Sequence, residues 1–394
     1  MDRVRAVARP DWRARVEAAG LGWHTADSGA PYWDETAYWR LTSAEVDRIE
    51  AAADELYVMV LAAVDHVIGS GALAAFGYSG KTAELIARSW RGRGAEPSLY
   101  ARFDLAYDGR ELKLLELNGD TPTALVEAAV AQWWWLEDTH PRLDQFNSVH
   151  DRLVEAWRVL PRGARVHLAA AADHAEDQGT VEYLAAAARD AGLDPVLLTL
   201  DQIGWREGDG PEGGRGRFVD LAERRIERLF KLAPWEWMLS DDFGDRLAGE
   251  VLAGRVRLIE PAWKMLASNK RLLVTLRELN PDSDLLLDAT TDEAVAQGWG
   301  DYVRKPVQGR EGADVTLFHS RPVGPPQVVA RQGGGSESDA YVYQRRAELA
   351  QANGVFAVLG VWVVGGKACG LGVRESDGPI TTNLARFVPH LIDG

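Results

Sequence analysis

Side chains suited to metal and phosphate chemistry gather in one predicted β-hairpin. The segment RFDLAYDGRELKLLELNGDTPT, residues 102–123, alternates apolar and polar residues on both sides of a DGR turn. Residues two apart on a strand share a face, so Glu116 and Asn118 point the same way. The turn places Asp104 opposite them, and Arg102 shares its face. The hairpin therefore brings two carboxylates, an amide oxygen and a guanidinium together.

Two interpretations of this face remain open from spacing alone. An all-oxygen set suits Mg²⁺, which keeps several waters and binds through few protein ligands plus substrate phosphates. The alternative is a solvated sheet face with ordinary ion pairs, since paired acids beside an arginine are common there.

Two lysines farther along the chain are candidate phosphate ligands. Lys270 ends AWKMLASNK, and Lys305 lies in VRKPVQGREGADV, a predicted strand that runs into a loop with Gly309 and Gly312. Such a loop can place backbone N–H groups and a point charge on phosphates. The segment AFGYSGKT is not a Walker A motif, because Ala75 stands where the first glycine is needed. The lysines alone are weak evidence for a nucleotide site.

Periodicity predicts a mixed α/β (α+β) fold to position these groups. The first hundred residues are predicted helical, with a long helix capped by Thr42 or Ser43, and a further helix is predicted from about Thr123 to Leu136. Alternating strands and helices in residues 151–262 predict a parallel sheet, and residues 263–394 are strand-rich. We therefore expect three segments: 1–150, 151–262 and 263–394.

Composition excludes several classes of function. The 394 residues carry 44 Lys+Arg and 59 Asp+Glu, a net charge of −15, which argues against a non-specific nucleic-acid binder and an anionic membrane surface. The single cysteine, Cys369, excludes an intramolecular disulfide and a multi-cysteine zinc site. No apolar segment reaches membrane-spanning length, so a cytoplasmic protein is expected.

These motifs together resemble the glutathionylspermidine synthase family. The resemblance begins with R-x-D and E-x-N-x-D-T-P-T at 102–123, and it continues through NK at 269–270, VRKPVQGREG at 303–312, YVYQ at 341–344 and VRESDGPITTN at 373–383. It covers nearly the whole chain and is strongest to the synthetase-only acid–amine ligases of the ATP-grasp superfamily. It implies an ATP-grasp-like fold with a helical N-terminal region and a βαβ pre-ATP-grasp-like lobe.

The resemblance also implies roles for residues at matching positions. The implied metal ligands are Asp104, Glu116 and Asn118. The implied nucleotide-binding residues are Lys270, Lys305, Gly309, Gly312, Gln344 and Arg374. The implied catalytic residues, which would stabilise the acylphosphate and the tetrahedral intermediate, are Arg102, Thr121 and Thr123. The acidic residues implied at the substrate end are Glu176 and Asp177.

The resemblance implies an ATP- and Mg²⁺-dependent ligase that joins a small-molecule or peptide carboxylate to an amine through an acylphosphate. Amidase activity is not expected, because the amidase of the family's bifunctional enzyme is an N-terminal Cys/His domain, whereas the one cysteine here, Cys369, lies in a late strand. Leu232 and Trp237 stand where the family's bifunctional synthetase, which also carries an amidase, has threonines, and this departure leaves the substrates open. Glycine-rich loops at 308–312 and 333–336 are candidates for a lid.

The alternatives to a ligase are a nucleotide-binding scaffold that has lost ligation and a phosphotransferase on the same scaffold. Oligomeric state cannot be inferred.

Overall fold

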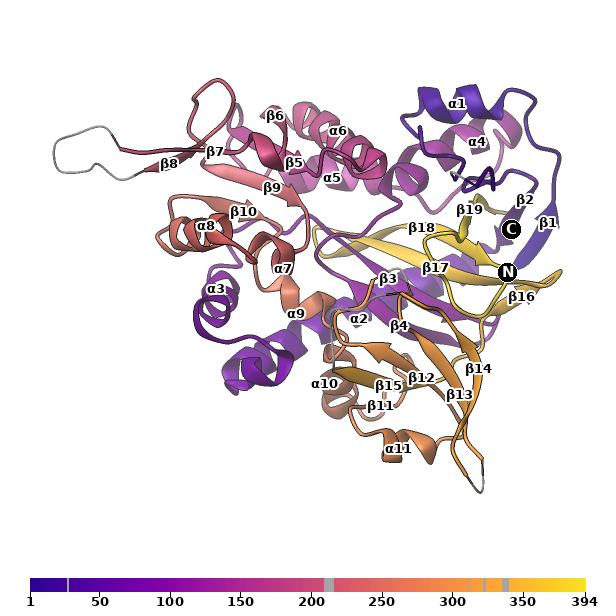
Figure 1. Cartoon of the computed structure of the whole chain (residues 1–394). Helices are drawn as coiled ribbons and strands as arrows, with labels where there is room; N and C mark the ends of the chain where they lie inside the picture. The colour runs from indigo at the N-terminus through magenta and orange to yellow at the C-terminus, as the bar shows by residue number, and fades with distance from the viewer. Residues whose placement is uncertain (27, 209–215, 311, 322–323, 335–339) are drawn as a thin grey trace.

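The computed structural model describes residues 1–26, 28–208, 216–310, 312–321, 324–334 and 340–394. It has the mixed α/β architecture expected from the sequence, with helices packed around several sheets (Figure 1). The helices are α1 (Trp12–Ala18), α2 (Ser43–Gly69), α3 (Gly80–Arg91), α4 (Gln132–Thr139), α5 (Val149–Trp157), α6 (Ala175–Asp190), α7 (Trp235–Met238), α8 (Asp242–Leu252), α9 (Lys264–Ser268), α10 (Leu272–Leu279) and α11 (Glu293–Gln297), with 3₁₀ turns η1 (Ala72–Phe76) and η3 (Leu200–Gln202).

A central antiparallel sheet contains the predicted hairpin. Its strands, in order across the sheet, are β19 (Arg386–Val388), β18 (Lys367–Ser376), β17 (Val355–Val364), β3 (Tyr100–Tyr107) and β4 (Leu112–Asn118), with β16 (Ala350–Ala352) also paired to β17. The β3–β4 turn is as expected: Gly109 adopts a φ of +94°, and Asp108 accepts the Arg110 N–H at 2.8 Å. Because β17 pairs with β3, strands from the first and third expected segments share this sheet.

A parallel sheet confirms the alternation of strands and helices seen in residues 151–262. Its strands, in order, are β10 (Arg257–Ile259), β9 (Arg228–Leu232), β5 (Arg165–Ala170) and β6 (Asp194–Thr199). Helix α6 connects β5 to β6 and packs on both strands. The small hairpin β7 (Gly204–Arg206) and β8 (Arg217–Val219) projects from this part of the molecule (Figure 1).

A second antiparallel sheet lies below the central one in Figure 1 and carries two candidate nucleotide residues. Its strands, in order, are β11 (Ala289–Thr290), β15 (Tyr341–Arg345), β12 (Asp301–Pro306), β13 (Thr316–His319) and β14 (Gln327–Arg331). Lys305 lies on β12 and Gln344 on the neighbouring β15. This sheet therefore faces the β3–β4 hairpin with a lysine and an amide.

The long N-terminal helix follows the sequence prediction, whereas its surroundings do not. Thr42 caps α2 in a capping box: its side chain accepts the Glu45 N–H, and its own N–H donates to the Glu45 carboxylate at 3.0 Å. The buried stripe of α2 packs against β17 and β18. The expectation of helix throughout the first hundred residues is wrong at β1 (Asp2–Arg5) and β2 (Ala37–Leu41), because β2 pairs with β20 (His390–Ile392) near the other end of the chain.

The helix after the hairpin differs from the prediction in its bounds and its geometry. Ala124 adopts a left-handed conformation with a φ of +67°, a π-helical turn follows at Glu127–Ala131, and α4 then continues to Thr139. A π-turn inserts an extra residue into the helix, which sequence periodicity does not reveal. In the described ranges, no helix has the length and apolar character needed to cross a membrane.

A buried histidine makes the stability of this fold depend on pH. His390 is fully buried; its Nδ1 lies 2.9 Å from Gln132 Oε1, and its Nε2 accepts the Phe146 N–H at 3.2 Å. Burial lowers the pKa of His390 to about 3, well below its ordinary value of about 6.5. The folded state thus holds this imidazole neutral, so its stabilisation is present above pH 6.5 and is lost as the pH falls.

We expect wild-type protein to lose about 0.8 kcal/mol more unfolding free energy than His390→Gln between pH 8 and pH 6. The unfolded imidazole binds a proton over this range, and the folded one does not. Urea unfolding of both proteins at each pH measures the difference. Identical pH dependence in the two proteins would contradict the assignment.

Candidate active site

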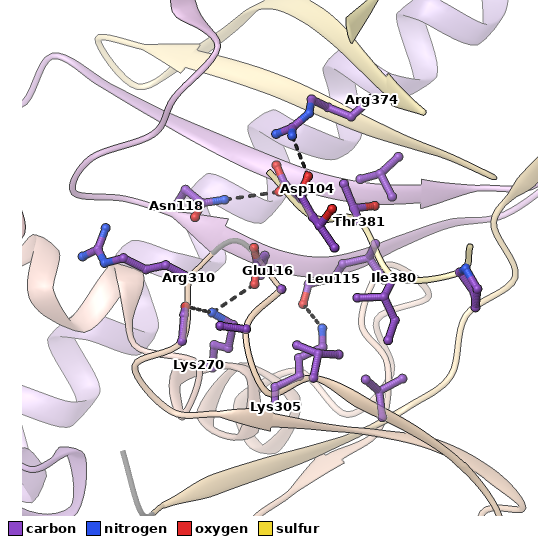
Figure 2. Close-up of a pocket in the computed structure, with 18 of the residues that line it drawn as sticks. Asp104, Leu115, Glu116, Asn118, Lys270, Lys305, Arg310, Arg374, Ile380 and Thr381 are labelled. Atoms are coloured by element: carbon purple, nitrogen blue, oxygen red, sulfur yellow. Dashed lines mark hydrogen bonds and ion pairs between the residues drawn. The ribbon is translucent and has the colours of Figure 1, made fainter. Parts of the chain in front are cut away.

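The hairpin strands pair in the register expected from the sequence. Asp104 lies opposite Glu116, and Arg102 lies opposite Asn118. Arg102 holds Asp104 in a two-pronged ion pair, with Nε–Oδ1 and Nη2–Oδ2 distances of 2.7 and 3.0 Å. Asn118 donates its side-chain N–H to the same carboxylate at 3.3 Å (Figure 2). The acids, the amide and the guanidinium therefore meet on one face.

A bulge in β4 links this hairpin to the sheet below it. The register shifts between Asp104 and Leu105, which leaves Leu115 as the extra residue. Lys305 Nζ donates to the Leu115 carbonyl at 2.9 Å and to Gln344 Oε1 at 2.8 Å. Burial lowers the pKa of Lys305 to about 8, although Glu116 opposes that shift. The bulge thus brings the buried ammonium of Lys305 to the hairpin.

Lys270 reaches the Glu116 carboxylate from the connection between α9 and α10. Its Nζ lies 3.1 Å from Glu116 Oε2 and donates to the Gly309 carbonyl at 2.5 Å (Figure 2). Burial alone would raise the pKa of Glu116, but Lys270 first and Lys305 next outweigh it and hold that pKa at about 2. The two lysines, far apart in sequence, therefore converge on one acid.

Two loops meet at the rim of this cluster. Gly312 has a φ of +72°, and a Cβ at this position would lie 2.6 Å from the Thr381 carbonyl, so only glycine fits the contact. Arg374 donates to the Thr382 carbonyl at 2.7 Å and so supports the neighbouring loop. The candidate lid segment 333–336 lies partly outside the described residues, which end at Gly334 on this side.

A cavity of about 220 Å³ collects nearly all the predicted site residues. The predicted residues that line it are Arg102, Asp104, Glu116, Asn118, Thr121, Thr123, Glu176, Lys270, Lys305, Gly309, Gly312, Gln344 and Arg374. Asp177 is the exception: it is half-buried on α6 and does not line the cavity. The hairpin, the two lysines, the glycine loop and Glu176 therefore belong to one site.

The donor set on the hairpin is one that Mg²⁺ accepts. Asp104, Glu116 and Asn118 offer carboxylate and amide oxygens from adjacent strands. Within the described ranges, no group of three or more His, Cys, Asp or Glu side chains could hold a metal by itself. A cation here would need oxygens from elsewhere, which is typical of sites that bind Mg²⁺ together with phosphates.

Comparison with known proteins identifies the family. The family model described as "Glutathionylspermidine synthase preATP-grasp" matches residues 3–393. The chain belongs to the glutathionylspermidine synthase family. The resemblance stated from the motifs is therefore confirmed.

Similar proteins in this family are named as ligases and synthetases. The protein of Haemophilus influenzae named "Putative acid--amine ligase" is 38% identical, and the match covers 99% of both chains. Trypanothione synthetase of Crithidia fasciculata is 31% identical over 71% of this chain and 45% of its own length. The bifunctional glutathionylspermidine synthetase/amidase of Escherichia coli is 24% identical over 91% of this chain and 60% of its own length.

One end of the cavity in this family member is acidic, and a buried acid that sequence reasoning missed lies near it. Glu176 accepts the Ala124 N–H at 3.2 Å. Glu127 lies close by with no exposed surface, and Trp23 Nε1 donates to it at 2.8 Å. Burial first, and then the charge of Glu176, raise the pKa of Glu127 to about 7. Tyr32 also lines this end of the cavity. Neither Tyr32 nor Glu127 was singled out from the sequence, and Glu127 carries no signal beyond its position after the hairpin.

Arg310 is a further residue that sequence reasoning did not single out. Its Nη1 donates to Thr121 Oγ1 at 2.7 Å, and its guanidinium carbon lies 5.8 Å from the centre of the Trp237 ring. Trp237, one of the departures from the bifunctional relative, is thus a surface residue beneath Arg310, whereas Leu232 is buried on β9. Arg310 therefore connects the glycine loop to the Thr121 loop and to α7.

Proposed function

We propose that this chain forms an amide bond between a carboxylate and an amine, with ATP as the source of energy and an acylphosphate as the intermediate. Its class, an ATP-dependent C–N ligase, is that of its family and of its named relatives. The observation that carries the proposal is the meeting of Glu116 with Lys270 and Lys305 inside a cavity that also holds the Arg102–Asp104 pair. Opposite charges on adjoining walls suit a polyphosphate and its cation.

The first step would transfer the γ-phosphoryl group of ATP to the carboxylate and release ADP. Lys270 and Lys305 would hold phosphate charge, and Gln344 would face the base from β15. The turn at Gly309 and Gly312 would cover the phosphates. Asp104, Glu116 and Asn118 would hold Mg²⁺, which supplies charge neutralisation on the phosphates. Because phosphoryl transfer needs mainly positioning and charge neutralisation, these side chains suffice without a nucleophile from the protein.

In the second step the amine, once it has lost a proton, would attack the acyl carbon, and phosphate and the second N–H proton would leave as the amide forms. Arg102 would stabilise the oxyanion that develops there, with the hydroxyls of Thr121 and Thr123 beside it. Glu176 would attract a cationic amine, and Asp177 would add negative potential from behind it. The acid and amine would enter from the end of the cavity where Tyr32 and Glu176 lie.

We also propose that the chain has no amidase activity and works in the cytoplasm, where its lone thiol stays reduced. Cys369 is fully buried on β18, and burial raises the pKa of its thiol to about 12. A thiol with such a pKa is not a nucleophile near neutral pH. We therefore expect the purified protein not to hydrolyse amide products of its own reaction.

Lys305→Met is expected to weaken ATP binding by about 10- to 100-fold, because a hydrogen bond to a charged group contributes about 1.5–3 kcal/mol. The substitution also leaves the Leu115 carbonyl and the Gln344 side chain without their donor. Titration calorimetry with a non-hydrolysable ATP analogue measures the change. Lys81→Met, which removes an exposed lysine paired with Asp245, is the matched control. Unchanged affinity in the Lys305 variant would contradict the nucleotide assignment.

Trapping with hydroxylamine tests the proposed acylphosphate directly. The protein is incubated with ATP, Mg²⁺ and a panel of carboxylates, and hydroxylamine replaces the amine. An activated acyl group gives a hydroxamate together with one ADP. Amide formation with a true amine, but no hydroxamate under the same conditions, would contradict the intermediate.

A further inference from the structure

A fully buried ion pair lies behind the loop that joins the metal hairpin to the helix after it. Lys231, on β9, and Asp120 have no more than 1% exposed surface, and their charged groups are in direct contact. The second oxygen of Asp120 accepts the Trp235 N–H at 3.1 Å, and Lys231 also donates to the Ala233 carbonyl at 3.0 Å. Every charged atom of this pair therefore has a defined partner.

Such a pair is costly, so stability alone does not account for it. Taking two charges out of water costs several kcal/mol each, and apolar residues of similar volume are often as stable. A charged pair with fixed hydrogen bonds can, however, hold the backbone that carries it in one conformation. The segment held in this way is the one that contains Asp120.

Asp120 belongs to the segment Gly119–Ala124, which we call the threonine loop. The loop begins after Asn118 and contains Thr121 and Thr123. The Gly119 and Asp120 N–H groups both donate to Ser268 Oγ, at 3.0 and 2.8 Å. Ser268 ends α9, two residues before Lys270. The loop is thus clamped between β9 on one side and the lysine segment on the other.

The far end of the threonine loop is strained. Ala124 has a φ of +67°, a conformation that costs a non-glycine residue about 1–3 kcal/mol and persists only where the surroundings enforce it. Its N–H is held by Glu176, and the Thr123 carbonyl accepts from Arg102 Nη1 at 2.6 Å. A strained loop that ends beside the arginine needs firm support at its other end, where Asp120 lies.

We propose that Lys231 and Asp120 form a positioning pair that holds the threonine loop, and with it Thr121 and Thr123, in place for the reaction. The pair touches neither nucleotide nor acceptor; it acts through the backbone of the loop. The expected loss of kcat in variants of this pair rests on the proposed ligase function. The expected loosening of the threonine loop does not.

The test is a double substitution, Lys231→Met with Asp120→Leu, which replaces the charged pair by apolar residues of similar volume. We expect a folded protein with some loss of thermal stability, because the Trp235 N–H and the Ala233 carbonyl lose their partners. Its kcat is expected to fall by on the order of 10²-fold, with a KM for ATP within about threefold of wild type, since a misplacement of about 1 Å far from the chemistry can cost that much. Ser268→Ala, a milder change at the other clamp, is expected to lower kcat in the same way by about 10-fold.

The matched control replaces another buried pair, Arg9→Met with Glu35→Leu, whose Nε–Oε2 distance is 3.0 Å and which does not line the cavity. Its kcat is expected to stay within about twofold of wild type. Wild-type kcat in the Lys231/Asp120 double variant, or a loss confined to KM for ATP, would overturn the proposal.

Hydrogen exchange separates this inference from the proposed function. In the Lys231/Asp120 double variant, the amides of residues 119–121, 123 and 124 are expected to exchange at least about 10-fold faster than in wild type, while the Arg9/Glu35 control leaves them unchanged. Unchanged exchange in the loop overturns the positioning pair, whether or not any substrate pair gives turnover. Absence of turnover in wild-type protein counts against the ligase alone.

Discussion

Replacing Glu116 by glutamine is expected to reduce ADP formation by on the order of 10³-fold, the equivalent of several kcal/mol of transition-state stabilisation. The change preserves shape but removes the charge on which Lys270 and Lys305 converge and which would hold the cation. The fold is expected to survive, because Glu116 opens into the cavity. A coupled assay for ADP at saturating ATP and Mg²⁺ measures the loss.

Glu111→Gln is the matched control for this prediction. Glu111 lies on the same hairpin, is mostly exposed, and pairs with Lys113 at 3.2 Å. Its removal is expected to change turnover by less than about twofold, as is usual for an exposed ion pair. Near-wild-type ADP formation in Glu116→Gln would remove the metal assignment and, with it, the chemical interpretation of the hairpin.

Arg102→Lys is expected to lower kcat by about 10²- to 10³-fold, the range seen when one oxyanion donor is lost. Lysine keeps the charge but cannot make the paired contacts to both oxygens of Asp104 while also donating to the Thr123 carbonyl. The measurement is kcat and KM for ATP in the same ADP assay, and KM is expected to change much less than kcat.

Arg110→Lys, an exposed arginine at the tip of the same hairpin, is the control and should retain full turnover. A normal kcat for Arg102→Lys would show that charge alone is needed at this position. A large rise in KM for ATP with kcat preserved would instead assign Arg102 to nucleotide binding.

The hairpin was predictable because its signals are local. Strand alternation and a turn at Gly109 place Asp104 opposite Glu116, and the structure has that register. The bulge at Leu115 was not predictable, since one extra residue in a strand leaves no mark on composition, yet it makes the Lys305 contact possible. Motif resemblance, and not periodicity, indicated that the distant lysines share the site.

Long-range pairing accounts for what the sequence analysis missed. Strand β2 exists because β20, from the opposite end of the chain, pairs with it, and the termini meet on one side of the molecule (Figure 1). Arg374, which was expected to contact nucleotide, lines the cavity and also donates to the Thr382 carbonyl, so its nucleotide contact stays a prediction. Three consecutive tryptophans, Trp133 to Trp135, also differ in their surroundings, since Trp135 is buried and Trp134 is exposed. Tertiary contacts, which the local sequence does not reveal, decide whether such a strand forms and which side chains are buried.

The central claim, ligation of an acid to an amine, is tested most directly by ADP release over a matrix of carboxylates and amines, with mass detection of products. The account predicts ADP formation that requires both partners in at least one pair, together with a product whose mass equals acid plus amine less one water. A stable phosphorylated product that forms without the amine would indicate a phosphotransferase. Nucleotide-dependent thermal stabilisation without ADP release for any pair would indicate a binding scaffold. Either result would contradict the ligase.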